Sequence, residues 1–197
     1  IDLRADAIDL LAVPGHKGLL GPPGTGALLL GEGVEIDGLR QGGTGTRSEE
    51  IEHPREYPER LEAGSPNAQG IAGLGAGVEW LLERGVEAVR RELESLAREL
   101  EAGLRAVPGL TLHGPEDLAA REPMFPVNLA GYRPDELAAA LDAGFGVQTR
   151  AGLHCAPGAH RVLGTFPEGA CRLSLGATST REDVQAALEA LRALAER

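Results

Sequence analysis

The feature that most constrains the fold is a stripe of apolar residues between positions 86 and 107. Its members recur at steps of three and four, the spacing at which an α-helix returns to the same face; they are Val86, Val89, Leu93, Leu96, Leu100, Leu104 and Val107. Pro108 and Gly109 follow and end the helix. The stripe therefore predicts one long amphipathic helix, whose apolar face must be covered by other elements.

Shorter elements are predicted on both sides of this helix. Before it, we expect a short strand or loop, a strand at 27–30, a long irregular segment at 37–66 and a small-residue helix at 67–82. After it, we expect strands at 110–113, 124–129, 146–150 and 171–175, and helices at 134–143 and 180–195. Such alternation is typical of α/β layers. In 197 residues the long helix is a natural bridge between a front and a back lobe.

Composition excludes several classes of function. The net charge of −11 argues against nucleic acid or an anionic membrane as the main partner. No apolar run reaches about 18 residues, and no signal-peptide pattern opens the chain. The two cysteines are too few for a disulfide scaffold, which fits a cytoplasmic protein. Because residue 1 is isoleucine, we expect the chain to be the later part of something longer.

Lys17 is the only lysine, and every other fixed cation on a side chain is an arginine. An arginine stays protonated, whereas a lysine amine can lose its proton and attack a carbonyl carbon. Lys17 is therefore a candidate Schiff-base lysine, and pyridoxal phosphate (PLP) is the commonest partner of such a residue. The alternative is a compositional bias that replaced nearly all lysines by arginine and left this one by chance.

The run Gly21–Gly26 is similar to the start of an ATPase phosphate loop, but it lacks the residues that the loop needs. A lysine and then a serine or threonine should follow the last glycine. Ala27 and Leu28 stand there instead. We therefore interpret this run as a sharp turn that leads from Lys17 into a core strand.

The two cysteines lie in different surroundings. Cys171 is part of a strand-like alternation and is expected to be a small buried hydrophobe. Cys155 lies in a loop rich in Gly and Pro, where a reactive thiol would be placed. Arg150 and His154 flank it and are the kind of neighbours that favour a thiolate.

Four segments together resemble the class V aminotransferase family, in particular its cysteine desulfurases and selenocysteine lyases. They agree with the family in order and spacing and cover essentially the whole chain, which corresponds to the second half of a full member. The segments are DLLAVPGHKGLLGPPGTGALLL at 9–30, RLEAGSPN at 60–67, RAGLHCA at 150–156 and CRLS at 171–174.

The resemblance implies how the cofactor is held. Lys17 would carry PLP and shuttle the Cα proton of the substrate. His16 would orient the cofactor or relay protons, with a packing role as the alternative. Ser65 would bind the phosphate across a homodimer interface, and its alternative role is a helix N-cap.

The resemblance also implies which residues bind the substrate and react with it. Arg172 would clamp the carboxylate with two parallel hydrogen bonds, and Arg150 is a second cation near the same loop. A structural ion pair is the alternative for Arg172. Cys155 would attack the sulfur of the substrate cysteine and keep it as a persulfide, with release of alanine; an inert loop cysteine is the alternative.

For the whole chain, the resemblance implies an α/β fragment of the fold-type-I PLP-dependent transferases. It would hold the end of the large domain (1–85), a connecting helix (86–107) and the complete small domain (108–197). The implied activity is cysteine desulfuration with transfer to a sulfur-acceptor protein and no metal. The alternatives are another class V enzyme, such as a selenocysteine lyase or an aminotransferase, and a non-catalytic interaction module.

Two departures from the family qualify this assignment. Members often carry a hydroxyl residue three positions before the lysine, where this chain has Pro14, which offers no donor. The acidic partner of the pyridine nitrogen and the ring that stacks on the cofactor lie in the family's first half. We therefore expect half an active site, in a fragment that is inactive alone.

Overall fold

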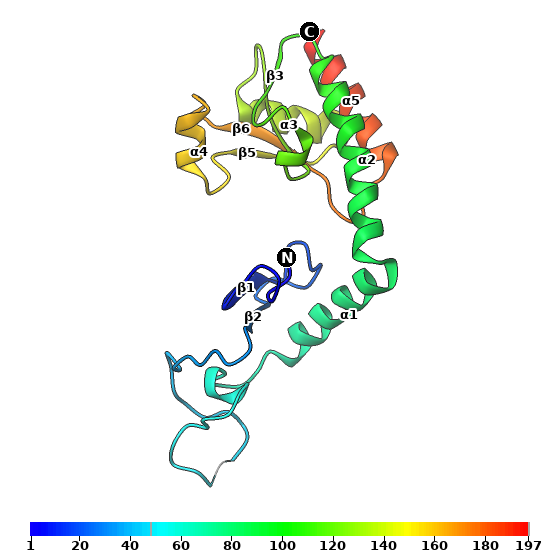
Figure 1. Cartoon of the computed structure of the whole chain (residues 1–197). Coiled ribbons are helices and arrows are strands. Elements are labelled where there is room, and N and C mark those ends of the chain that lie inside the picture. Colours follow the sequence, from blue (N-terminus) through cyan, green and yellow to red (C-terminus); the bar gives the residue numbers. More distant parts are fainter. Residues whose placement is uncertain (48, 197) are drawn as a thin grey trace. The chain divides into compact units, whose positions relative to one another are not determined.

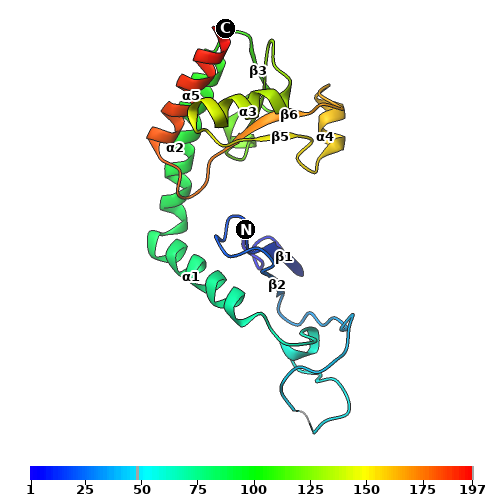
Figure 2. The ribbon, with the colours of Figure 1, turned by 180° about the vertical axis from the view of Figure 1, so that it is seen from behind.

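The computed structural model describes residues 1–47 and 49–196, which form two compact units (Figures 1 and 2). We call Ile1–Gly85 unit 1 and Val86–Arg197 unit 2. Each has its own set of helices and strands. No helix in the described part of the chain is both long and apolar enough to cross a membrane.

Unit 1 consists of a hairpin, a long irregular segment and one helix. The elements are β1 (Leu10–Pro14), β2 (Gly26–Leu30), the 3-10 turn η1 (Glu59–Leu61) and α1 (Ala68–Arg84). The strands β1 and β2 pair antiparallel, with Pro14 opposite Gly26. The prediction of a strand at 27–30 and a helix at 67–82 is confirmed, each to within two residues.

A glycine face on α1 receives the turn that joins β1 to β2. A Cβ atom at Gly77 would collide with the carbonyl oxygen of Leu19, and one at Gly73 would lie 2.8 Å from Pro22 Cγ. Because these positions lack side chains, the backbone of the turn can approach the helix closely. Small residues in α1 therefore determine where the turn that carries Lys17 lies within unit 1.

Unit 2 is built on a four-stranded antiparallel sheet with the order β3-β4-β6-β5. The strands are β3 (Leu110–Leu112), β4 (Met124–Leu129), β5 (Arg150–Gly152) and β6 (Ala170–Ser174). Side chains of the central strands alternate between faces, as a pleated strand requires. One face carries the buried residues Phe125, Val127, Leu129, Cys171 and Leu173. Arg172 lies on the opposite face of β6 and is only partly buried.

Three helices complete the core of unit 2. They are α2 (Val86–Arg105), α3 (Pro134–Phe145) and α5 (Arg181–Ala195), and their buried residues form one cluster with the apolar face of the sheet. The helices α2 and α5 lie side by side in both views, and the short helix α4 (Pro157–Val162) lies at the far end of the unit from them (Figures 1 and 2). A further 3-10 turn, η2, spans Leu118–Ala120.

Most predicted elements of unit 2 are confirmed, with one clear error. The long helix begins at Val86 as predicted, and Thr180 with Asp183 forms the expected capping box of α5. The strand predicted at 146–150 is wrong, because β5 begins only at Arg150. Gly146 instead caps α3 in the left-handed conformation, and the amide of Val147 donates to the carbonyl of Leu141.

Candidate functional site

The six predicted site residues divide equally between the two units. Unit 1 holds His16, Lys17 and Ser65, and unit 2 holds Arg150, Cys155 and Arg172. In unit 1, His16 and Lys17 lie in the turn between β1 and β2. Hydrogen bonds close this turn, from Gly15 N to Thr25 O at 2.8 Å and from Leu20 N to Lys17 O at 3.0 Å.

The Lys17 amine is chemically available. Its side chain is exposed and forms no hydrogen bond or ion pair with any described residue. A primary amine without a carboxylate partner is the group that an aldehyde cofactor needs. His16, next to it, is also exposed, and its role beside the cofactor stays a prediction. The donor set of this turn therefore fits PLP, although the phosphate and the ring nitrogen need further groups.

Ser65 lies between η1 and α1 and is exposed. The N-cap of α1 is Asn67, whose side chain accepts from Gly70 N at 3.0 Å, so the capping role considered for Ser65 is wrong. Ser65 forms no hydrogen bond with any described residue, and therefore none with Lys17. Its hydroxyl is free to bind a ligand.

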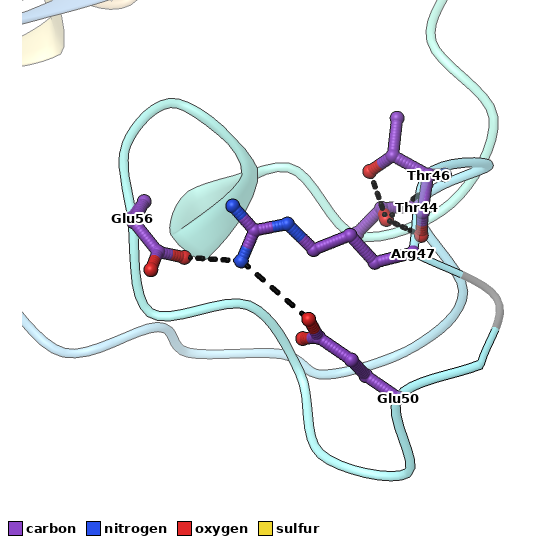
Figure 3. Close-up of polar contacts among 5 residues, drawn as sticks. All are labelled: Thr44, Thr46, Arg47, Glu50 and Glu56. Carbon is purple, nitrogen blue, oxygen red and sulfur yellow. Dashed lines mark hydrogen bonds and ion pairs between the residues drawn. The ribbon is translucent and has the colours of Figure 1, made fainter.

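A polar cavity of about 1240 Å³ lies within the irregular segment of unit 1, lined by residues between 35 and 60. Figure 3 shows Arg47 reaching toward Glu56, at 2.8 Å, and Glu50, at 3.7 Å. The hydroxyl groups of Thr44 and Thr46 lie 2.9 Å apart. None of the six candidate residues lines this cavity. The ion pairs of Arg47 therefore stabilise the irregular segment and are not part of the candidate site.

In unit 2, the sheet brings Arg150 and Arg172 together. They are directly opposite each other in the pairing of β5 with β6. Two cations in this position repel each other unless an anion lies between or beside them. Neither forms an ion pair with any described carboxylate, and Arg172 Nε donates only to Ser174 Oγ, at 2.9 Å. No described residue forms the structural ion pair considered for Arg172, and the binding of a carboxylate by the two arginines stays a prediction.

The candidate nucleophile lies beside this pair. Cys155 is exposed, and its Sγ lies 3.8 Å from Arg150 Nη2. Its backbone has a φ of 60°, and that of His154 a φ of 52°, both in the left-handed region. Non-glycine residues adopt this conformation at a cost, and such strain is concentrated at functional sites.

His154 sits next to the thiol as a neutral imidazole. Burial lowers its pKa, and the charges of Arg172, His160 and Arg150 act in the same direction, against the opposing effect of the Arg150 carbonyl. His154 Nε2 donates to that carbonyl at 2.9 Å, which fixes the tautomer. Arg150 is thus the cation beside Cys155. His154 adds no positive charge there, and its side chain is held by the Arg150 carbonyl.

Cys171 behaves as predicted for a structural cysteine. It is fully buried, and its Sγ donates to Thr149 Oγ1 at 3.2 Å. Burial raises the pKa of this thiol, which makes it a poor nucleophile.

Sequence reasoning missed two structural features that lie near the candidate residues. One is the glycine face of α1, for which the spacing of Gly70, Gly73 and Gly77 was a readable signal. The other is buried His160 in α4, a helix too short to show periodicity. No group of three or more potential metal ligands occurs among the described residues.

Comparison with known proteins identifies relatives along the whole chain. The family model of the class V aminotransferases matches residues 1–187. A probable cysteine desulfurase of Methanothermobacter thermautotrophicus is 32% identical over 99% of this chain and 50% of its own length. A cysteine desulfurase of an Enterobacter species is 34% identical over 93% of this chain and 45% of its own length.

Solved structures of two cysteine desulfurases are also similar to this chain. The apo cysteine desulfurase of Thermococcus onnurineus superposes with a TM-score of 0.83 at 28% identity, over 98% of this chain and 48% of that chain. Escherichia coli cysteine desulfurase CsdA gives a TM-score of 0.82 at 30% identity, over 99% and 48%. The chain therefore spans about half the length of these relatives.

Proposed function

Because this chain belongs to the class V aminotransferase family, whose members depend on PLP, we propose that it is the C-terminal portion of a cysteine desulfurase. Residues 1–85 would be the end of a fold-type-I large domain, 86–107 the connecting helix and 108–197 the small domain. The enzyme would act as a cytoplasmic homodimer, with Ser65 contributing to the phosphate site of the partner subunit.

The observation that carries this proposal is the grouping of Cys155, Arg150 and Arg172 in unit 2. The arginines bind the substrate carboxylate and hold the cysteine beside the thiol. A positive pair with no carboxylate of its own among the described residues, next to an exposed thiol, suits a small anionic substrate that contains sulfur.

The transfer step balances without an added oxidant. The Cys155 thiolate attacks the substrate sulfur, so that an S–S bond forms while the substrate Cβ–S bond breaks. The electron pair of that bond stays with Cβ, which takes up a proton and becomes the methyl group of alanine. PLP, when bound, supplies the electron sink that labilises bonds around Cα. Lys17 holds the cofactor and moves the Cα proton through Nζ.

Turnover of two substrates by the protein expressed from its native reading frame tests this proposal. We expect Cys155→Ala to lower kcat for L-cysteine by more than about 100-fold, because loss of a nucleophile costs orders of magnitude. Selenocysteine cleavage should persist, since it can proceed without the thiol. Lys17→Ala should abolish both activities. Release of sulfur from cysteine by Cys155→Ala at the wild-type rate would overturn the assignment.

A further inference from the structure

The Cys155 thiol is carried by the segment 153–169, which connects β5 to β6 and contains α4. The base of this segment is tightly closed. A Cβ atom at Gly169 would collide with the backbone of Gly152, and Asn128 Nδ2 donates to the carbonyl of Gly169 at 3.3 Å. These contacts fix the base of the segment but do not reach α4 at its centre, and Cys155 lies between the base and α4.

His160 is the only buried residue of α4 and anchors the centre of the segment. Its side chain is 3% exposed, and its Nδ1 lies 2.7 Å from Thr165 Oγ1. Its carbonyl accepts from Thr165 N at 2.9 Å and from Phe166 N at 3.2 Å. Loss of the hydrogen bond of a buried polar side chain is costly, so His160 holds α4 against the segment that follows it, at Thr165 and Phe166.

The ring of His160 also packs against the residue next to the thiol. The centroids of the His154 and His160 rings lie 5.4 Å apart, with the rings tilted by 47°. His154 in turn donates to the Arg150 carbonyl. A chain of contacts thus runs from Thr165 through His160 and His154 to Arg150, and the left-handed turn at His154 and Cys155 lies along it.

We propose that His160, held by Thr165, is a positioning residue that keeps the turn at His154 and Cys155 in the conformation that holds the thiol beside Arg150. This role deepens the proposed function and rests on it. In this role His160 touches neither substrate nor cofactor. It acts because two consecutive non-glycine residues in the left-handed region need a surrounding structure that enforces them.

Two variants separate the hydrogen bond from the volume of the ring. Thr165→Val keeps the shape of the partner but removes its hydroxyl, and His160→Phe keeps a ring but removes Nδ1. The control is Val162→Ala in the same helix, because Val162 is 88% exposed. His160→Asn can present a polar atom near the position of Nδ1, so it should recover part of the wild-type behaviour that His160→Phe loses.

The first readout is hydrogen exchange of the Ala156 amide, which donates to the Leu153 carbonyl at 2.8 Å across the turn, measured on the protein expressed from its native reading frame. We expect exchange to be faster by about 10-fold in Thr165→Val and His160→Phe, since loss of one hydrogen bond shifts a local equilibrium by about this factor. Val162→Ala should match the wild type. Wild-type exchange in both test variants would overturn the proposal.

The second readout is steady-state kinetics. A displaced nucleophile should lower kcat for L-cysteine by about 10- to 100-fold with KM unchanged, while selenocysteine cleavage keeps its rate. An equal loss of both activities, together with a lower melting temperature, would mean that His160 only supports the fold, and would overturn the positioning role. If the wild type cleaves neither substrate, the proposed function fails, while the exchange result still decides whether His160 holds the turn.

Discussion

At the scale of single residues, the site in unit 2 depends on which side chains carry charge. Partial burial of His154 lowers its pKa from the ordinary value of 6.5, and the charges of Arg172, His160 and Arg150 lower it further. In the proposed enzyme, the substrate carboxylate would meet two guanidinium groups and a neutral imidazole at neutral pH, not three cations.

A titration of His154 by NMR tests this arrangement. We expect a midpoint below the ordinary range in the wild type, and a rise in Arg172→Gln, because one of the repelling charges is removed. Arg161→Gln is the control, since Arg161 is not among the charges that act on His154. A midpoint at or above the ordinary value would contradict the assignment of a neutral imidazole.

The same shift links the stability of unit 2 to pH. Because the folded protein holds His154 with a lowered pKa, the unfolded chain takes up this proton first as the pH falls. The contribution of His154 to the free energy of unfolding is therefore unfavourable below the ordinary pKa and absent at higher pH. We expect this part of the acid destabilisation to disappear in His154→Gln.

Residue-scale chemistry could be predicted from the sequence only where the residue type is rare or its setting unusual. Lys17 is a candidate because it is the only lysine, and Cys155 because it lies among glycine and proline, and both roles stay predictions. His160 could not be found, because its importance comes from burial and from a partner five residues away, which no sequence pattern expresses. The pairing of Arg150 with Arg172 depends on sheet register, which the misplaced strand at 146–150 obscured.

At the scale of elements, long periodic helices are predictable and short ones are not. The helices α2 and α5 show an apolar stripe over several turns, and both were predicted within two residues of their bounds. The six residues of α4 bury one side chain, so they offer no periodicity. The glycines of α1 suggest a weak helix by propensity, yet their spacing suits close contact with the Lys17 turn.

Two substitutions in α1 test this contact. Gly77→Ala should lower the free energy of unfolding by about 1–3 kcal/mol, the usual cost of overpacking, because the new methyl group meets the Leu19 backbone. Gly75→Ala is the matched control, since a Cβ there has no neighbour within 4 Å. That change should be neutral or stabilising by up to about 1 kcal/mol through helix propensity.

Denaturant unfolding of the protein from its native reading frame measures both changes. If Gly77→Ala were as stable as Gly75→Ala, the glycine face would not position the turn. Binding of PLP to the two variants provides a second readout, and only Gly77→Ala should weaken it, because only this change displaces the segment that carries Lys17.

At the scale of the whole molecule, the chain contains a complete core in unit 2 and a sparse one in unit 1. Unit 2 has a cluster of buried apolar residues contributed by its helices and sheet. In unit 1 the hairpin exposes Leu10, Leu28 and Leu29, at 45%, 45% and 38%. Exposed apolar surface of this kind marks a place where other protein packs. This agrees with a chain that spans about half the length of its relatives.

In the proposed enzyme, sulfur passes through Cys155. The most direct measurement is a single turnover with L-cysteine in the absence of reducing thiols, followed by mass spectrometry of the peptides that contain Cys155 and Cys171 and by quantification of alanine. We predict one added sulfur atom on Cys155, none on Cys171, and one alanine per persulfide. Alanine formed without sulfur on Cys155 would rule out transfer through this thiol.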